Sequence, residues 1–261
     1  MKVENNRLLL YASESYVSLN QNSTHKFAMH QALKIYKSNT IYTFIPKNAC
    51  TTMRVSLAMA NKCIGTLKDF NWIHKNNATF CANLSDLVCA EYTFVILRSP
   101  LLRLASVYLD KIVDRTGVAW HLYDIAQRKI DLASLTFREF VDIVTKDDYV
   151  RSDLHWRPQV DFLVYEKYDD YFTLENFSKA IPIIELKAKI TIYDARNLTK
   201  HGTDQYSMLN DTCYADMTAE EIYQMKKNGI IPSHQSLYDK KLEEQVKLAY
   251  KEDMILYEKY L

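Results

Sequence analysis

Two apolar runs, each followed by a helical pattern, dominate the hydrophobic profile of the chain. Residues 41–45 (IYTFI) and 92–97 (YTFVIL) are continuous runs of β-prone residues, each stopped by a turn signal. The segments that follow, TTMRVSLAMANKC from Thr51 and LLRLASVYLDKIV from Leu101, carry apolar residues at helical spacing. Continuous apolar strands alternating with helices are typical of a parallel sheet covered on both faces. We therefore expect an α/β fold of three layers, with a central, mainly parallel sheet flanked by helices.

Weaker patterns complete the prediction. Further helices are expected at 118–130, 136–146, 218–228 and 239–259, and further strands near 162–165, 169–174 and 189–193. Residues 1–39 are polar and weakly patterned, which predicts an N-terminal arm or helical extension that could form a homodimer contact or a lid. No internal repeat or linker divides the rest, so residues 40–261 are expected to form one domain.

Composition and charge narrow the classes of partner. The 261 residues are 48% hydrophobic and 25% charged, as in soluble globular proteins, and the net charge is +1. Since the net charge is close to zero, we expect no nucleic-acid partner. No apolar stretch approaches the length needed to span a bilayer, so we expect no stable membrane insertion. The five cysteines are odd in number and form no CxxC pair, which favours reduced thiols in a cytoplasmic protein. No His/Cys cluster indicates a metal.

The turn after the first apolar run has the character of an anion-binding loop. It comprises Lys47, Asn48, Ala49, Cys50, Thr51 and Thr52. The unpaired N–H groups of a helix N-terminus attract anions, Lys47 adds a full charge, and the threonines add hydroxyl donors. Because the GxxxxGK[ST] pattern is absent, a magnesium-dependent kinase or ATPase is disfavoured. The alternative is an ordinary helix capped by Asn48 or Thr51, with Lys47 in solvent.

A second candidate anion-binding feature lies at the end of the second apolar run, residues 92–97. Arg98 follows the strand, where open α/β sheets bind ligands, and its planar fork of donors suits a phosphate. Ser106, two turns into the next helix, could supply another donor. The alternative is an arginine at a helix start beside a surface serine. Two such loops at the carboxyl ends of two strands are a stronger signal than either alone.

These segments resemble the motifs of sulfotransferases that use PAPS (3′-phosphoadenosine 5′-phosphosulfate). FIPKNACTTMR is similar to their 5′-phosphosulfate loop, and VILRSPLLRLASVYLDKI is similar to the 3′-phosphate motif of the Golgi-type carbohydrate group, sulfotransferase family 2. Four further segments resemble that group in the same order, namely HWRPQVDFL, YDDYFTLENF, DARNLTK and LAYKEDMILYEKY. The resemblance runs from about residue 41 to the C-terminus.

The resemblance implies a P-loop-like fold and transfer of a sulfuryl group from PAPS to a carbohydrate hydroxyl, with PAP as product and no metal. It implies that Lys47 contacts the bridging oxygen of the leaving group and that residues 48–52 hold the 5′-phosphate. Arg98 and Ser106 would hold the 3′-phosphate. Ser99 departs from the family, which usually has an acid there. The Golgi members of the family have a membrane anchor and paired cysteines after the HW segment. This sequence shows neither, which fits a soluble, bacterial or cytoplasmic relative.

Two histidines are candidates for the base that takes the acceptor proton. His74 lies between the two PAPS motifs, where related enzymes place their base, and we rank it first. His155 begins the HWRP segment. Trp72, Trp120 and Trp156 could stack on sugar rings. Two alternatives stay open: a catalytically inactive PAP- or PAPS-binding module, and a different nucleotide-dependent, kinase-like transferase.

Overall fold

The computed structural model describes residues 7–12, 17–76, 78–198 and 205–261. The chain divides into two compact units. The sheet unit comprises residues 1–98, 159–199 and 257–261, and the helical unit comprises residues 99–158 and 200–256. Each unit has an apolar core of its own.

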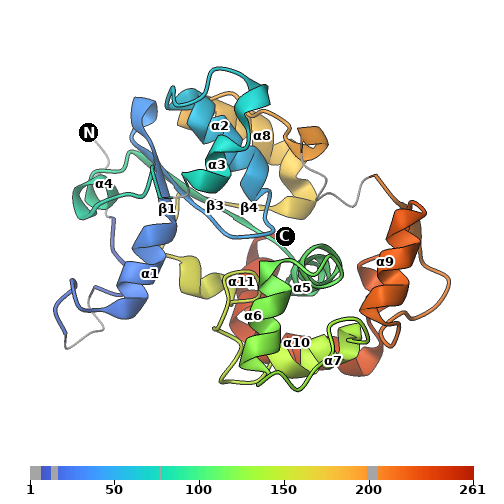
Figure 1. Ribbon diagram of the computed structural model, residues 1–261. Coiled ribbons are helices and arrows are strands. Elements are labelled where there is room, and N and C mark those ends of the chain that lie inside the picture. The colour runs from blue at the N-terminus through green and yellow to red at the C-terminus, as the bar shows by residue number, and fades with distance from the viewer. Residues whose placement is uncertain (1–6, 13–16, 77, 199–204) are drawn as a thin grey trace. The chain divides into compact units, whose positions relative to one another are not determined.

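A four-stranded sheet forms the centre of the sheet unit (Figure 1). Its strands, in spatial order, are β1 (Ala32–Ile35), β2 (Thr40–Thr43), β3 (Tyr92–Leu97) and β4 (Asp170–Thr173). The strands β2, β3 and β4 are parallel, whereas β1 pairs antiparallel with β2. All residues of β2 and β3 are buried, as expected of inner strands covered on both faces. The predicted α/β class with a mainly parallel sheet is therefore confirmed.

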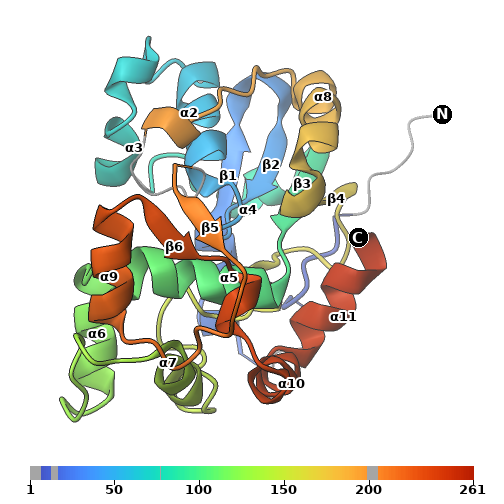
Figure 2. The same ribbon diagram turned by 90° about the vertical axis from the view of Figure 1, so that its right-hand side faces the viewer.

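Helices cover one face of this sheet (Figure 2). They are α2 (Cys50–Ala60), the short α3 (Trp72–Lys75) and α8 (Phe177–Ala188). Alternate strand residues point toward these helices, and the stacked rings of Tyr42 and Phe94, 5.2 Å apart, lie in the resulting core. The remaining helices of the unit are α1 (Ser23–Gln31) and α4 (Leu84–Val88).

The segment that leads into β4 is hydrogen-bonded both to β2 and to the N-terminal segment. The hydroxyl of Tyr168 lies 2.7 Å from Oγ1 of Thr43 in β2 and accepts the N–H of Val164 at 3.0 Å. The N–H of Leu10 donates to the carbonyl of Val164 at 3.0 Å, so part of the N-terminal segment is bound to the same stretch.

The helical unit is built around aromatic side chains. Its helices are α5 (Pro100–Val107), α6 (Gly117–Ile125), α7 (Phe137–Val144), α9 (Ala219–Lys227) and α10 (Lys240–Ala249), and α11 (Lys251–Tyr260) begins in it. A π-helical turn, Tyr108–Ile112, continues α5. The short strands β5 (Ser207–Leu209) and β6 (Ile230–Pro232) pair in parallel. Trp156, Tyr108 and Phe137 are fully buried in the core.

Most predicted elements are present, with three differences. The helix predicted at 239–259 is divided at Tyr250 into α10 and α11. The strand predicted at 189–193 is wrong: this stretch is irregular, and its backbone N–H groups donate to side chains of α8 and α2 (Glu185 and Ser56) instead of to a neighbouring strand. The strand predicted near 162–165 is also wrong, because a 3₁₀ turn, Gln159–Phe162, precedes a single bridge between Leu9 and Tyr165.

The segment assigned to an N-terminal arm or helical extension contains regular structure. Within residues 1–39 lie the helix α1 and the strand β1. Leu33 and Ile35 of β1 are buried in the core of the sheet unit. The edge of the sheet thus lies upstream of residue 40, while the role of the arm stays a prediction.

Candidate functional site

The loop between β2 and α2 has an unusual backbone. Lys47 and Ala49 have φ angles of 72° and 54°, in the left-handed region that non-glycine residues rarely occupy. Ala49 is the N-cap of α2, and among the described residues no side chain caps this helix. The N–H groups of its first turn therefore keep their capacity to bind an anion.

Asn48, between the two left-handed residues, holds the loop to the adjacent strand. Its side chain is fully buried and its amide donates to the carbonyl of Ile96 in β3 at 2.8 Å and to Oε1 of Gln159 at 2.7 Å. The side chain of Asn48 therefore helps to shape the loop. Its contact with a cofactor, expected from the sequence, stays a prediction.

Arg98 joins the same network. Its backbone N–H donates to Oε1 of Gln159 at 3.0 Å, and its Nη1 donates to the carbonyl of Lys47 at 3.0 Å. The structure therefore brings together the two predicted anion-binding features, the Lys47 loop and Arg98. Both lie at the carboxyl ends of neighbouring parallel strands, β2 and β3.

Gln159 is the residue that the sequence analysis missed. It is 1% exposed and its Nε2 donates to the carbonyl of Arg98 at 2.8 Å, in addition to the two bonds that its Oε1 accepts. A lone glutamine has no motif of its own. The available signal was its position directly after Pro158 in the HWRPQ segment.

The two threonines of the loop have different surroundings. Thr51 is half-buried, whereas Thr52 is buried and its Oγ1 accepts the N–H of Ala195 at 3.3 Å. One turn later, Oγ of Ser56 accepts the N–H of Tyr193 at 2.9 Å. Thr52 therefore helps to fasten residues 193–195 to α2, although a hydroxyl that accepts one bond can still donate another. Cys50 is half-buried and unoxidised.

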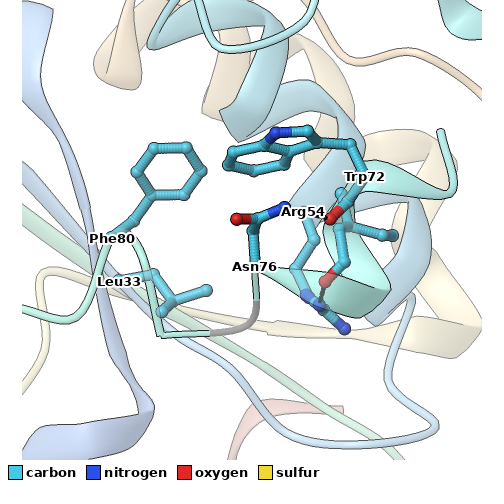
Figure 3. A pocket seen from close by; sticks show the side chains of 6 residues that line it. Leu33, Arg54, Trp72, Asn76 and Phe80 are labelled. Atoms are coloured by element: carbon cyan, nitrogen blue, oxygen red, sulfur yellow. Dashed lines mark hydrogen bonds between the residues drawn. The ribbon is translucent and has the colours of Figure 1, made fainter. Parts of the chain in front are cut away.

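A small pocket lies beside α2 (Figure 3). Its lining residues are Leu33, Arg54, Trp72, Ile73, Asn76 and Phe80, and its volume is about 10 Å³. A space of this size holds about one water molecule. Arg54 donates to the carbonyl of Ile73, and its guanidinium lies 5.4 Å from the centre of the Phe44 ring. Burial lowers the pKa of Arg54. The pocket is a packing defect, too small for a nucleotide or a sugar.

His74 and His155, the two candidate bases, have different environments. His74 is exposed near the end of the short helix α3. His155 is paired: its Nδ1 lies 2.7 Å from Oδ1 of Asp153, which also accepts the backbone N–H of His155 at 2.8 Å. With its proton on Nδ1, the imidazole carries a lone pair on Nε2 that can accept another.

The surroundings of Asp153 favour the ionised form of its carboxyl group. Burial acts to raise the pKa of Asp153, but the hydrogen bonds from His155 and the nearby charges of His155 and His121 outweigh it. The net pKa of Asp153 lies below its ordinary value, so at neutral pH the group is a carboxylate that accepts hydrogen bonds. An ionised acceptor of this kind orients an imidazole.

The predicted site residues are divided between the units. The loop residues 47–52, His74 and Arg98 belong to the sheet unit, whereas Ser106 and His155 belong to the helical unit. Ser106 is buried in α5 rather than on the surface. The joint binding of one phosphate by Arg98 and Ser106 stays a prediction.

The three tryptophans differ in burial. Trp156 is fully buried, and its indole donates to the carbonyl of Tyr149 at 2.9 Å. Trp72 packs 5.7 Å from the ring of Phe80. Trp120 is 54% exposed, so of the three tryptophans it is the one with an indole open to solvent.

Among the described residues, no three or more His, Cys, Asp or Glu side chains are grouped to hold a metal ion. None of the described helices is both long and apolar enough to cross a bilayer.

Comparison with known proteins identifies the family. No curated protein and no solved structure matches the chain. The model of the sulfotransferase family matches residues 35–260, and this span includes the Lys47 loop, Arg98, Gln159 and the Asp153–His155 pair. The chain therefore belongs to the sulfotransferase family, family 2, and is a transferase of sulfuryl groups.

Proposed function

We propose that this sulfotransferase uses PAPS as donor and transfers the sulfuryl group to a hydroxyl of a carbohydrate, releasing PAP. The observation that carries the proposal is the network that fastens the Lys47 loop to Arg98 through Asn48 and Gln159. It supports a site for a ligand with two anionic groups, because it joins a helix N-terminus and a lysine to an arginine.

The residues of this network fit the donor. PAPS carries a 5′-phosphosulfate and a 3′-phosphate. The N–H groups of the first turn of α2 and the hydroxyl of Thr51 can donate to the first of these. A guanidinium has five N–H donors in a planar fork, so the bond from Arg98 to the carbonyl of Lys47 is compatible with a contact to the 3′-phosphate. The carbohydrate acceptor rests on the type of motif and on Trp120.

The chemistry needs charge stabilisation and a base. As the acceptor oxygen bonds to sulfur, the bond between sulfur and the bridging oxygen breaks and the acceptor proton passes to a base. Lys47 would stabilise the negative charge that develops on the leaving group. The pairing of His155 with Asp153 supports His155 as the base, ahead of His74, because the carboxylate holds the imidazole with Nε2 ready to accept a proton. Only three residues separate His155 from Gln159 along the chain.

Isothermal titration calorimetry with PAP tests the donor assignment, with ADP and adenosine 5′-phosphosulfate as controls. We expect PAP to bind much more tightly than either control, because only PAP carries both the 3′- and the 5′-phosphate. Lys47→Ala should lower the rate of PAP release from PAPS by orders of magnitude. Lys62→Ala is the matched control, since Lys62 also has a left-handed backbone (φ 61°) but is exposed beyond the end of α2.

The two alternative functions, a kinase-like transferase and an inactive binding module, predict different results. Equal binding of ADP and PAP would favour a kinase-like transferase. An inactive binding module would bind PAP tightly. It would neither transfer sulfuryl groups to a panel of saccharides nor release PAP from PAPS. Absence of PAP binding by folded protein would overturn the proposal.

A further inference from the structure

The segment that carries His155 is held by buried side chains from distant parts of the sequence. The carbonyl groups of Leu154, Trp156 and Arg157 each accept a hydrogen bond from such a side chain. The two donors are Arg103, in α5, and Tyr250, between α10 and α11. Both belong to the helical unit, as does the segment that they bind.

Arg103 fixes two peptide groups at once. It is 2% exposed, and its Nη1 donates to the carbonyl of Arg157 at 2.7 Å while its Nη2 donates to the carbonyl of Leu154 at 3.0 Å. A planar guanidinium that bonds two carbonyls sets both the distance between them and their orientation. His155 lies between these two carbonyls in the chain.

Tyr250 fixes the carbonyl between them. Its hydroxyl donates to the carbonyl of Trp156 at 2.7 Å, and the residue is 3% exposed. Burial raises the pKa of Tyr250, the charge of Arg103 lowers it and the charge of Asp253 raises it, so these three groups are neighbours in the interior. The raised pKa keeps the Tyr250 hydroxyl a neutral donor at neutral pH.

The Asp153–His155 pair is thus constrained through the backbone of residues 154–157 and through the ring of His155. The bonds from Arg103 and Tyr250 fix the peptide groups on either side of His155, and Asp153 fixes its ring. We infer that Arg103 and Tyr250 are positioning residues for the sulfuryl-transfer reaction, which hold the 154–157 segment so that Nδ1 of His155 faces Asp153. The inference rests on the proposed role of His155 as the base.

A pair of isosteric variants separates positioning from stability. Tyr250→Phe removes the hydroxyl that binds Trp156. Tyr108→Phe is the matched control, because Tyr108 is fully buried in the same unit and its hydroxyl also donates to a backbone carbonyl, that of Leu135, at 2.8 Å. Both variants lose one buried tyrosine–carbonyl bond, so we expect similar falls in melting temperature. Only Tyr250→Phe should weaken the pairing of His155 with Asp153.

The readout is the tautomer of His155, observed by ¹⁵N NMR of histidine-labelled protein at pH 8 without any ligand. In the wild type and in Tyr108→Phe we expect the Nδ1–H form. In Tyr250→Phe the ratio of the Nδ1–H to the Nε2–H form should fall roughly fivefold, the change that one lost hydrogen bond makes in an equilibrium. Arg103→Lys, whose ammonium lacks the planar fork that sets the distance and orientation of the two carbonyls, should give a fall at least as large. Arg138→Lys, whose partners are Asp216 and Asp239, should give none.

The outcomes distinguish this inference from the proposed function. An Nδ1–H tautomer that persists equally in Tyr250→Phe and Tyr108→Phe would overturn the positioning role and leave the base assignment standing. Absence of the Nδ1–H tautomer from the wild type would instead remove the basis for His155 as the base.

Discussion

The side-chain amide of Gln159 bonds both backbone groups of Arg98, accepting its N–H at 3.0 Å and donating to its carbonyl at 2.8 Å. In this way Gln159 continues the pairing of β3 beyond its last residue, Leu97. The same Oε1 also accepts from Asn48 in the loop after β2. One buried side chain therefore sets the separation of the two features that we propose to hold PAPS.

Gln159→Leu should weaken both folding and donor binding. The apolar side chain leaves the amide of Asn48 and the N–H of Arg98 without their partner in the interior, so we expect the free energy of unfolding to fall by about 2–3 kcal/mol. PAP affinity should fall as well, because the loop is no longer fixed to Arg98. Urea unfolding and calorimetry check the two effects. Unchanged PAP affinity in the folded variant would show that the network does not shape the site.

The two threonines of the loop should respond differently to the same change. Thr52→Val removes the acceptor of the Ala195 N–H, so we expect stability to fall by about 1 kcal/mol. Thr51→Val should leave stability unchanged and lower PAP affinity only. Parallel urea unfolding and PAP titration of the two variants provide the measurement. A loss of stability in Thr51→Val as large as that in Thr52→Val would contradict this division.

The base assignment predicts an asymmetry between the histidines. His155→Gln should lower the rate of sulfuryl transfer by about 10²–10⁴-fold, the usual contribution of a general base, with PAP affinity unchanged. His74→Gln, an exposed position on α3, should retain nearly the wild-type rate. The rates are measured as PAP release from PAPS in the presence of a saccharide acceptor. The reverse pattern would restore His74 as the base.

Asp153 should make stability depend on acid pH. Its folded pKa lies below the ordinary value of about 3.9, so its contribution to stability is complete above that pH and is lost as the pH falls through the folded pKa. The stability difference between wild type and Asp153→Asn should therefore be largest near pH 6 and shrink below pH 4. Urea unfolding across this range measures it. Asp148→Asn, at an exposed position of the same unit, is the control.

Arg7 should be a strong contributor to stability although it lies near the start of the chain. Its guanidinium donates to the carbonyls of Ala90 and Glu91 at 2.9 and 3.0 Å and pairs with Asp169 at 2.9 Å. With a side chain 5% exposed, it holds the N-terminal segment to the residues just before the starts of β3 and β4. Arg7→Ala should lower the free energy of unfolding by about 3 kcal/mol.

The exposed pair of Arg128 and Asp124 is the control for that change. Arg128→Ala should alter the free energy of unfolding by no more than about 0.5 kcal/mol, because both side chains lie in solvent. Equal effects of the two substitutions would mean that the contacts of Arg7 contribute little to folding.

The features that the sequence predicted best are those with a continuous apolar pattern. Residues 92–97 form β3 with the predicted bounds, because every one of them is buried and β-prone and no turn residue interrupts the run. The loop after β2 was also found, since a lysine and two threonines between a strand and a helix form a local signal. Gln159 was not, because its partners are 61 and 111 residues away in the chain.

The errors have physical causes of the same kind. The stretch KITIY from Lys189 is β-prone, yet the N–H groups of Ile192 and Tyr193 donate to the side chains of Glu185 in α8 and Ser56 in α2, which no local pattern reveals. Helix α8 was missed because Pro182 lies inside it, where proline usually ends a helix. The pairing of His155 with Asp153 had a local signal in the D-x-H spacing, which the ranking of the two histidines did not use.

The left-handed backbone of Lys47 and Ala49 has a consequence for protein engineering. Each of these residues is about 1–2 kcal/mol less stable in this conformation than in the right-handed one, since neither is glycine. The shape of the loop is therefore imposed by Asn48, Gln159 and Arg98 and is not a local preference of its own sequence. Residues 44–60 grafted onto another strand–helix junction would lose this shape, whereas a graft that also carries the partners of Asn48 would keep it.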